Sequence, residues 1–428
     1  MTDARRTRVV AGTRRIIDPA ATLERIMPSA LSIGMTRVAD VTRLDTIGIP
    51  VAIAVRPNSR SLSVAQGKGV TIEAAKASAA MECLELHHAE HVSLAVQIIS
   101  RTELARRGAT VVDVERLAKR QNSRFHSDLR IPWIVGSGAR SGIPTLVPLE
   151  MVDMDCVRPR AYTTGCFYGG SNGLASGNCR EEAIAHGLLE LVERDAKSLW
   201  WHLGADRQAA TQIDPASVDD PVAVDLIARF EAVGVGVAIW DMTSDLDIAT
   251  FRVAAIDRNI HEYRRLSVTA GHGCHLDRGV ALIRALTEAA QARLTAITGS
   301  RDDVTRASLE GGADALSRAG ARRALELGGV QRRDFHEVPH APNEFLEDDI
   351  DTTIERIEAA ALPEPIVVDL VGVDDDDARI AVVKLVGPGL EPNPAEAVAA
   401  GHRLSTRLAA RLATDLATDL ATDLAGVV

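Results

Sequence analysis

Glutamate recurs in two stretches of the chain at spacings that place it on one face of a helix. The stretches are residues 71–90 and 180–201, whose other positions are largely Ala, Leu and Met. The polar residues at helical spacing are Ser78, Glu82 and Glu85 in the first stretch, and Glu182, His186, Glu190 and Glu193 in the second. Residues three or four positions apart lie above one another on a helix. Each stretch therefore predicts an acidic stripe along an otherwise apolar helix.

The chemistry that such stripes favour is the binding of a hard cation. Like charges one turn apart repel each other, and more so when they are partly buried, unless a cation lies between them. Arg194 supplies one cation, and bound metal would supply others. Oxygen ligands without cysteine suit Mg²⁺, which binds one or two carboxylates together with phosphate oxygens. Two glutamates from each helix predict a site for Mg²⁺ and a nucleoside triphosphate. For either helix alone, a solvated acidic face is the alternative.

Candidate phosphate-binding groups accompany the two stripes. Residues 165–178, before the second helix, are rich in Gly, Ser and Asn and predict a loop whose backbone N–H groups favour phosphate. The sequence has no G-x-x-x-x-G-K-[ST] and no G-x-G-x-x-G after a strand, which excludes a P-loop. A third predicted helix, 279–299, carries Glu288 and Gln291. Arginines in or after it that are candidates for forking onto phosphate are Arg284, Arg293 and Arg301. An ordinary amphipathic helix with exposed arginines is the alternative.

The sequence gives weaker support for a rival metal site, the di-iron carboxylate centre of helix bundles. Glu85 and His88 form an E-x-x-H unit, which is the ligand unit of di-iron carboxylate helix bundles. Such bundles need a second unit, but Glu190 is followed at the third position by Glu193, and Glu193 by Ala196. The many strand-like segments also disfavour an all-helical bundle.

The elements that must position these residues mix strands and helices along the whole chain. Asp18 and Pro19 predict the start of a first helix, and Thr71 predicts the cap of the helix that carries Glu82. The predicted strands are 49–57, 145–152, 234–242, 248–256, 364–373 and 379–387. Because strict βαβ alternation is not obvious, we expect an α+β or mixed α/β fold, with mixed sheets flanked by helices, rather than a doubly wound sheet.

Three regions are expected along the chain. Residues 1–50 form an N-terminal arm with the first helix, residues 51–391 form the catalytic domain, and residues 392–428 form a helical tail. The tail repeats ATDL three times in succession over residues 413–424, a period close to one helical turn. The repeat is interpreted as a tandem expansion without functional weight, with a helix that docks on a partner subunit as the alternative.

Composition excludes several classes of protein. The chain has 428 residues, 46% of them hydrophobic, and a net charge of −11, which argues against bare nucleic acid or an anionic membrane as the main partner. Its five cysteines form no C-x-x-C pair, which suits a reducing compartment and predicts a cytoplasmic protein. The N-terminus lacks the apolar run of a secretory signal, and no stretch approaches 18 consecutive apolar residues, so no membrane span is expected.

Several of these motifs, in this order, resemble the YcaO superfamily, and within it the TfuA-associated branch. The resemblance runs from about Gly12 to Glu391. It is carried by GKG at 67–69 with the first glutamate stripe, NGLASGN at 172–178 with the second, GHGCHLD at 271–277, EAAQARL at 288–294 and KLVGPGLE at 384–391. The resemblance implies an enzyme that uses ATP and Mg²⁺ to phosphorylate a backbone amide oxygen of a peptide. A nucleophile then adds to the carbon, and phosphate leaves.

The resemblance also implies roles for individual residues. The implied Mg²⁺ ligands are Glu82, Glu85, Glu190 and Glu193, and the implied nucleotide contacts are Arg15, Thr22, Ser78, Asn178, Glu182, Arg194 and Arg293. A neighbouring Cys, Ser or Thr side chain as the nucleophile gives an azoline, whereas an external sulfur donor gives a thioamide. One departure is Leu86 after Glu85, where many relatives have arginine.

Thioamide formation with a TfuA-like partner is the favoured activity. Azoline-forming relatives end in a proline-rich C-terminus, whereas this chain ends in GVV after the repeat. No winged-helix segment for leader binding is recognisable, which places substrate recognition on a partner chain. A homodimer is expected from the resemblance. The alternatives are an azoline-forming cyclodehydratase and a nucleotide-binding accessory protein without chemistry of its own.

Overall fold

The computed structural model of the chain describes residues 6–10, 12–157, 164–258, 268–301, 325, 332–371, 380–393 and 398–408. The helices are α1 (Pro19–Ser32), α2 (Ile72–Glu90), α3 (Arg101–Arg106), α4 (Arg180–Trp201), α5 (Ala205–Ala209), α6 (Pro221–Ala232), α7 (Arg278–Thr298) and α10 (Leu346–Ala359). The strands are β1 (Arg8–Val10), β2 (Thr13–Arg15), β3 (Arg37–Asp40), β4 (Val51–Val55), β5 (Val64–Lys68), β6 (Gln97–Ser100), β7 (Arg130–Gly138), β8 (Pro144–Pro148), β9 (Leu174–Gly177), β10 (Gln212–Ile213), β11 (Val235–Asp241), β12 (Thr250–Asp257), β13 (Thr269–Cys274), β14 (Ile366–Asp369) and β15 (Ala381–Val386).

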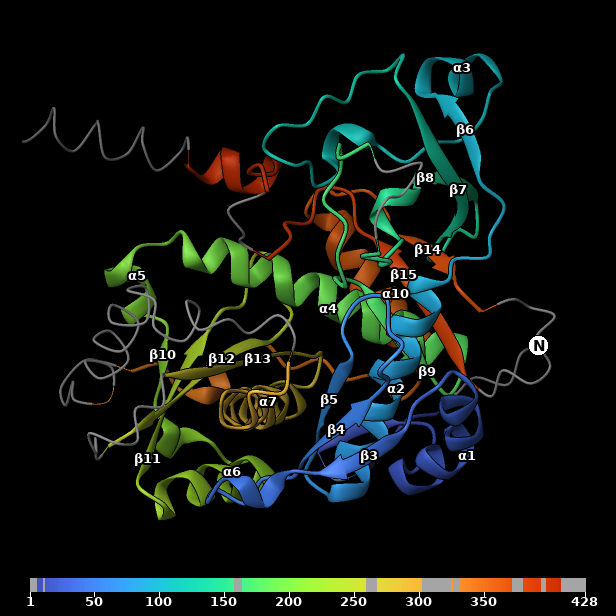
Figure 1. The fold of residues 1–428 in the computed structure, drawn as a ribbon. Coiled ribbons are helices and arrows are strands. Elements are labelled where there is room, and N and C mark those ends of the chain that lie inside the picture. The colour runs from blue at the N-terminus through green and yellow to red at the C-terminus, as the bar shows by residue number, and fades with distance from the viewer. Residues whose placement is uncertain are drawn as a thin grey trace, which may run out of the picture.

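These strands form separate sheets joined by helices (Figure 1). The largest has the order β6-β7-β14-β15-β9, with β8 also paired to β7; a second has the order β10-β11-β12-β13, and a third the order β3-β4-β5. Every pairing between these strands in the described part of the chain is antiparallel. The expected mixed α and β architecture is therefore confirmed, and the parallel βαβ alternation of a doubly wound sheet is missing from the described residues.

Three helices lie where the sheets meet and bring their polar faces together. α2 packs on β4 and β5 and also contacts β9, α4 packs on β9 and β15, and α7 packs on β12 and β13 (Figure 1). Their apolar sides belong to clusters of buried Ala, Val, Leu and Ile, as the low aromatic content predicts. Burying these sides fixes the direction in which the opposite, glutamate-bearing sides point.

The helices begin where the sequence places their capping residues. The side chain of Asp18 accepts from the N–H of Ala20 at 2.9 Å, and that of Thr71 accepts from the N–H of Ala74 at 3.2 Å. Asp277 caps α7 by accepting from the N–H of Gly279 at 2.9 Å, and Gly299 ends that helix in the left-handed conformation. Each cap satisfies a backbone group that the helix end leaves unpaired.

Two predictions about local structure were wrong. Residues 174–177, within the predicted loop before α4, form β9 and pair with β15. Glycine and serine disfavour strands on local grounds, but here packing of α2 and α4 on β9 requires small residues and overrides that preference. The strand predicted over 145–152 ends at Pro148, after which Leu149–Met151 form a 3-10 turn.

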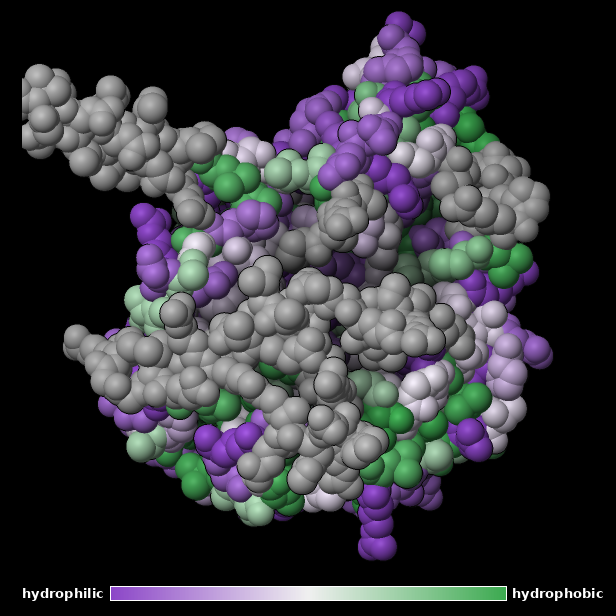
Figure 2. Space-filling model, turned by 60° about the vertical axis from the view of Figure 1, so that its left-hand side comes forward, coloured by the Kyte–Doolittle hydropathy of each residue, from purple (hydrophilic) through white to green (hydrophobic). Residues whose placement is uncertain are grey.

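The C-terminal region is described only in part. Residues 402–408 are helical, whereas the ATDL repeat lies outside the described residues. In the part of the chain that the structure describes, no helix has the length and apolar character to cross a membrane. Hydrophilic and hydrophobic residues are interspersed over the described surface visible in Figure 2.

Candidate active site

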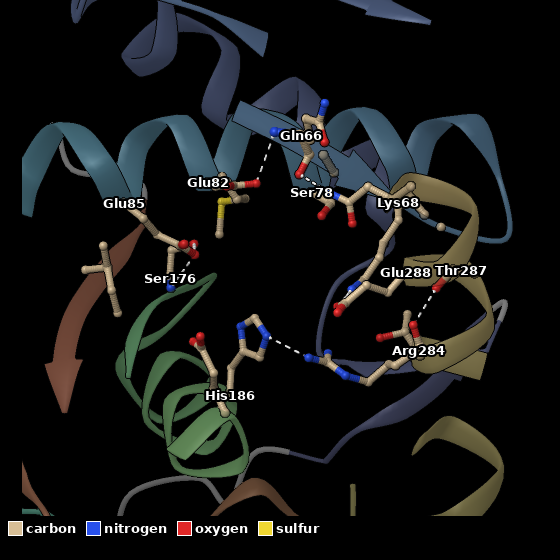
Figure 3. Close-up of a pocket in the computed structure, with 18 of the residues that line it drawn as sticks. Gln66, Lys68, Ser78, Glu82, Glu85, Ser176, His186, Arg284, Thr287 and Glu288 are labelled. Atoms are coloured by element: carbon tan, nitrogen blue, oxygen red, sulfur yellow. Dashed lines mark hydrogen bonds and ion pairs between the residues drawn. The ribbon is translucent and has the colours of Figure 1, made fainter. Parts of the chain in front are cut away.

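A cavity of about 630 Å³ lies between the N-terminal arm, α2 with β5, β9 with α4, and α7. The side chains that Figure 3 labels come from these elements and point toward one central space. The cavity brings together the predicted residues Arg15, Thr22, Ser78, Glu82, Glu85, Asn178, Glu182, Glu190, Glu193 and Arg194. Both predicted stripes therefore face the same cavity, although α2 and α4 are far apart in the sequence.

One end of the cavity joins the N-terminal arm to the start of α4. Arg15 Nη1 donates to Glu182 Oε1 at 3.1 Å, and Asn178 Nδ2 donates to the same oxygen at 3.2 Å. The hydroxyl of Thr22 donates to Asn178 Oδ1 at 3.2 Å. Cys179 caps α4, because its sulfur accepts from the N–H of Glu182 at 3.4 Å. These contacts fix three segments around the N-terminus of α4, which favours anionic groups.

The α2 carboxylates are held by backbone and hydroxyl donors rather than by cations. Glu82 Oε2 accepts from the N–H of Gln66 at 3.1 Å, and Glu85 Oε1 accepts from the N–H and hydroxyl of Ser176 at 2.9 and 2.6 Å (Figure 3). Burial raises the pKa of Glu82 to about 7 and that of Glu85 to about 8, and repulsion from Glu190 adds to both increases. The cluster therefore has too little positive charge nearby to hold all its carboxylates ionised at neutral pH.

The α4 carboxylates share one arginine. Arg194 lies 3.4 Å from Glu190 and 3.1 Å from Glu193, measured between side-chain nitrogen and oxygen. Burial raises the pKa of Glu190, and the attraction of Arg194 opposes that effect. One guanidinium between two acids leaves a net negative charge on this side of the cavity.

Lys384 is a buried cation near Glu190 that sequence reasoning missed, although it does not itself line the cavity. It lies on β15, is 2% exposed, and donates to the carbonyl oxygens of Gly170 and Asn172. Burial lowers its pKa to about 8, and the nearby Glu190 opposes that shift. The available signal was a single lysine inside the otherwise apolar strand 381–386. Such a lysine is costly to bury unless it has partners.

The α7 wall supplies positive charge opposite the glutamates. Arg284 and Arg301 line the cavity, as does Glu288, which forms an ion pair with Lys68 of β5. Arg284 Nη2 lies 3.2 Å from Nε2 of His186, and burial lowers the pKa of His186 well below its ordinary value (Figure 3). Arg284 Nε is buried and has no hydrogen-bond partner within the described protein. A half-buried guanidinium with an unused, buried N–H donor suits an anionic ligand.

Arg293 does not reach the cavity, which corrects the sequence-based expectation. It is 5% exposed and pairs with Asp45 at 2.7 Å and Asp257 at 3.0 Å. Gln291 and Thr295 of the same helix line the cavity. Two helical positions correspond to a rotation of about 200°, so a residue two places from Gln291 points to the opposite side. Arg284 and Arg301, which sequence reasoning weighed equally, are the arginines of this segment that line the site.

The residues present fit Mg²⁺ bound together with a phosphate ligand. The glutamate cluster consists of hard oxygen donors with deficient counter-charge, which is the environment that Mg²⁺ stabilises. No three carboxylate, imidazole or thiol side chains among the described residues close around a point as a complete ligand set. Mg²⁺ ordinarily completes its shell with water and phosphate oxygens, so such a set is not required. His88 does not line the cavity, so the E-x-x-H unit of a di-iron site is not assembled there.

The fold and cavity define a class of protein with an acidic, arginine-lined pocket for an anion and metal, built without a P-loop. A family model described as YcaO cyclodehydratase, ATP- and Mg²⁺-binding, matches residues 66–391, and the chain belongs to this family. This membership confirms the family predicted from the sequence and the expectation of ATP and Mg²⁺ as cofactors.

Similar proteins come from bacteria and archaea. A Rhizobium leguminosarum bv. trifolii protein described as lying in the tfuA 3′ region is 36% identical over 383 residues, covering 88% of each chain. A Methanothermobacter thermautotrophicus protein is 33% identical over 399 residues, covering 91% of this chain and 98% of its own length. The first of these supports placement in the TfuA-associated branch.

Solved structures share the fold. The structure of YcaO from Methanopyrus kandleri bound with AMPPCP and Mg²⁺ has a TM-score of 0.70 and 24% identity, covering 92% of this chain and 99% of that one. A heterocyclase in complex with substrate and cofactor has a TM-score of 0.72 and 21% identity. This chain covers 54% of that heterocyclase, which is therefore a longer protein.

Proposed function

We propose that this protein uses ATP and Mg²⁺ to activate backbone amides of a peptide by O-phosphorylation. The observation that carries the proposal is the convergence of two glutamate stripes and several cationic side chains on one cavity, in a chain of the YcaO family. A neutral amide is a poor electrophile, and its oxygen is a poor leaving group. Phosphorylation turns that oxygen into part of a phosphate, so catalysis consists of positioning and charge stabilisation.

Each group of residues has a proposed task. The residues that would hold Mg²⁺ are Glu82, Glu85, Glu190 and Glu193. Bound Mg²⁺ neutralises phosphate charge during transfer. The residues that would orient the nucleotide are Arg15, Thr22, Ser78, Asn178, Glu182 and Arg194. In place of Arg293, Arg284 and Arg301 would contact phosphate oxygens, because they line the cavity.

We propose thioamide formation as the specific activity, with a TfuA-type partner. The similarity to a protein of the tfuA 3′ region supports this choice. A peptide substrate, a leader-binding partner and a homodimer belong to the same proposal. Mass spectrometry of the modified peptide separates the alternatives, because azoline formation loses water whereas thioamide formation exchanges oxygen for sulfur. The heterocyclase among the similar structures favours retaining azoline formation as the second candidate.

Substitution of the paired glutamates tests the phosphorylation step. In Glu82→Gln and Glu190→Gln, ATP turnover with Mg²⁺ and peptide should fall by about 100-fold or more, because several kcal/mol of charge stabilisation is lost. Glu73→Gln, which changes an exposed glutamate in the first turn of α2, is the matched control and should retain turnover. Thermal unfolding of all variants verifies folding. Unchanged turnover in both pocket variants would refute the metal assignment, and ATP binding without turnover under any partner combination would favour an accessory protein.

A further inference from the structure

The polar stripe of α4 continues beyond the proposed metal ligands. Lys197 follows Glu193 by four positions, and Trp201 follows Lys197 by four, so all three share one face of the helix. Next to this end of α4, on β12, lies Arg252. Unlike Glu193, the residues Lys197, Trp201 and Arg252 do not belong to the cavity lining described above. They form a separate cluster, which we call the tryptophan–cation cluster, together with Trp200, Trp240 and His272.

Arg252 is a buried cation enclosed by indole rings. It is 7% exposed, and its guanidinium carbon lies 5.0 Å from the ring centroid of Trp201 and 5.9 Å from those of Trp200 and Trp240. Its Nη1 donates to Nε2 of His272 at 3.3 Å. Burial lowers its pKa to about 10. Within the described residues it forms no ion pair with a carboxylate.

Other buried arginines of the described chain are paired differently. Arg56 lies 2.5 Å from Glu90, and Arg293 pairs with both Asp45 and Asp257. Arg403, which is half-buried as a residue, lies 3.0 Å from Asp195. Burying a guanidinium without a counter-charge costs free energy that these ion pairs offset. Arg252 departs from this pattern, because a neutral imidazole and aromatic faces take the place of a carboxylate.

A second cation, Lys197, lies on α4 one helical turn before Trp201, the indole whose ring centroid is 5.0 Å from Arg252. Lys197 is partly buried, and among the described residues its ammonium group forms no hydrogen bond or ion pair. Burial lowers its pKa to about 8; repulsion from Arg194 and Arg252 acts in the same direction, and Glu288 and Glu193 oppose it. Two neighbouring, poorly solvated cations repel each other, and an anion between them would remove that cost.

The cluster adjoins the cavity through His272. This residue pairs in register with Arg252 across β12 and β13, and its Nδ1 lies 3.5 Å from Oε1 of Glu288. Because Nε2 of His272 accepts from Arg252, its proton lies on Nδ1, facing Glu288. Glu288 lines the cavity and pairs with Lys68. An anion held by Lys197 and Arg252 would therefore lie beside the cavity wall, one helical turn beyond Glu193.

We propose that Lys197 and Arg252 bind the sulfur anion, hydrosulfide or thiocarboxylate, that attacks the phosphorylated amide. The inference rests on the proposed function. A guanidinium is weakly hydrated, and sulfur is polarisable and makes favourable contacts with aromatic rings. An aromatic-walled, poorly solvated cation pair therefore favours a soft sulfur anion over a strongly hydrated oxygen anion, whose dehydration costs more.

The chemistry balances with ATP and hydrosulfide alone, or with water as an added reactant when a thiocarboxylate is the donor. The γ-phosphoryl group of ATP is transferred to the amide oxygen, giving ADP. Hydrosulfide adds to the amide carbon through a new C–S bond, and the C–O bond then breaks. The amide oxygen leaves in hydrogen phosphate, which takes the proton of hydrosulfide, and C=S remains. With a thiocarboxylate as donor, its sulfur forms the new C–S bond and phosphate leaves. Water then attacks the acyl carbon and breaks the S–acyl bond, which leaves C=S on the peptide and a carboxylic acid on the donor. No oxidation or reduction occurs.

Binding measurements test this site independently of turnover. The protein, loaded with AMPPCP and Mg²⁺ under anaerobic conditions, is titrated with hydrosulfide, thioacetate or acetate, and binding is followed by calorimetry and tryptophan emission. Three of the four tryptophans lie in the cluster, and the fourth, Trp133, is 0% exposed. Emission should therefore report the cluster. Hydrosulfide and thioacetate should bind saturably, and acetate more weakly than thioacetate.

Two variants of the cluster and one control variant make the result specific. Lys197→Met should weaken hydrosulfide and thioacetate binding by about tenfold or more, because a charge-assisted contact is lost. Arg252→Lys keeps the positive charge but loses the paired N–H donors of the guanidinium. It should weaken sulfur-anion binding less than Lys197→Met does. Lys76→Met, on α2 outside the cavity lining, should leave binding unchanged.

Two results would refute the assignment of Lys197 and Arg252 as a sulfur-anion site. Absence of saturable sulfur-anion binding by calorimetry would do so, as would equal binding by Lys197→Met and the unaltered protein. An equal loss of AMPPCP affinity in Lys197→Met would assign the cations to the nucleotide instead. Failure of the proposed function would appear separately, as absence of Mg²⁺-dependent AMPPCP binding in the unaltered protein.

Discussion

At the scale of single residues, the pocket is governed by carboxylates that lack sufficient counter-charge. Burial raises the pKa of Glu82 to about 7 and that of Glu85 to about 8. In the unfolded chain the same groups titrate near their ordinary value. At pH values between the ordinary pKa of glutamate and these raised pKa values, the metal-free folded protein binds more protons than the unfolded chain. The free energy of unfolding must therefore fall as pH rises through this range. Mg²⁺ binds the deprotonated form and opposes this loss.

We therefore predict that the melting temperature of the metal-free protein decreases between pH 6 and pH 8.5, a range that spans the raised pKa values of about 7 and about 8. Glu85→Gln should reduce the slope, because it removes one proton-binding group. Mg²⁺ with AMPPCP should also reduce it, with affinity rising with pH. Differential scanning calorimetry across this range measures each effect. Glu73→Gln should keep the original slope, and a melting temperature that rises with pH would contradict the prediction.

At the scale of elements, the site depends on how closely strands approach helices. A Cβ atom added at Gly67 of β5 would lie 2.1 Å from the carbonyl oxygen of Ala75 and 2.1 Å from the backbone nitrogen of Ala79 on α2. At Gly271 of β13, an added Cβ would lie 2.1 Å from the carbonyl oxygen of Ala285 on α7. These contacts set the separation between each strand and its helix, and hence the position of the side chains around the cavity.

Gly67→Ala should displace β5 from α2 and carry Gln66 and Lys68 with it. We expect a loss of about 1–3 kcal/mol or more in unfolding free energy, because the colliding atoms are backbone atoms that cannot rotate away. Nucleotide binding should weaken as well. Urea denaturation and AMPPCP calorimetry measure the two effects. Gly170→Ala, where the nearest atom to an added Cβ is 3.8 Å away, is the control and should be nearly neutral.

At the scale of the whole molecule, the C-terminal segment is attached to the back of the helix that forms the site. Asp195 of α4 is 0% exposed, accepts from the N–H of Glu391 at 2.9 Å and lies 3.0 Å from Arg403. Glu391 in turn accepts from the N–H groups of Gly401 and Leu404 at 3.0 and 2.8 Å. Glu391, Gly401, Arg403 and Leu404 therefore form one polar network with Asp195, the residue next to Arg194.

Arg403→Met should destabilise the protein by about 3–5 kcal/mol, because it leaves the carboxylate of Asp195 buried and unpaired. Burial raises the pKa of Asp195 to about 6, so the loss should be larger at pH 8 than at pH 5, where the group is protonated. Arg407→Met removes only an exposed contact with Asp245 and should cost less than about 1 kcal/mol. Chemical denaturation at pH 5 and pH 8 measures the loss of unfolding free energy in each variant. An equal loss for Arg403→Met at the two pH values would contradict the proposed pairing with ionised Asp195.

Much of the site was predictable because its signal is local. The stripes of α2 and α4 follow from helical periodicity, and their starting points follow from Thr71 and from the Gly-rich segment before residue 180. Lys384 carries a weaker signal, since one charge in an apolar strand predicts a partner but not its identity. β9 carries a misleading signal, because its small residues are required by packing and not by strand preference.

By itself the sequence determined the helices that carry the site, the caps at Asp18 and Thr71, the glutamate faces and the family, because each depends on neighbouring residues or on ordered motifs. Tertiary structure alone decided that Arg284 enters the cavity while Arg293 pairs with Asp45 and Asp257. It also decided that Arg252 lies among the rings of Trp200, Trp201 and Trp240. The physical reason is that periodicity shows which side of a helix is apolar, whereas the groups that its other side meets depend on packing between elements distant in sequence.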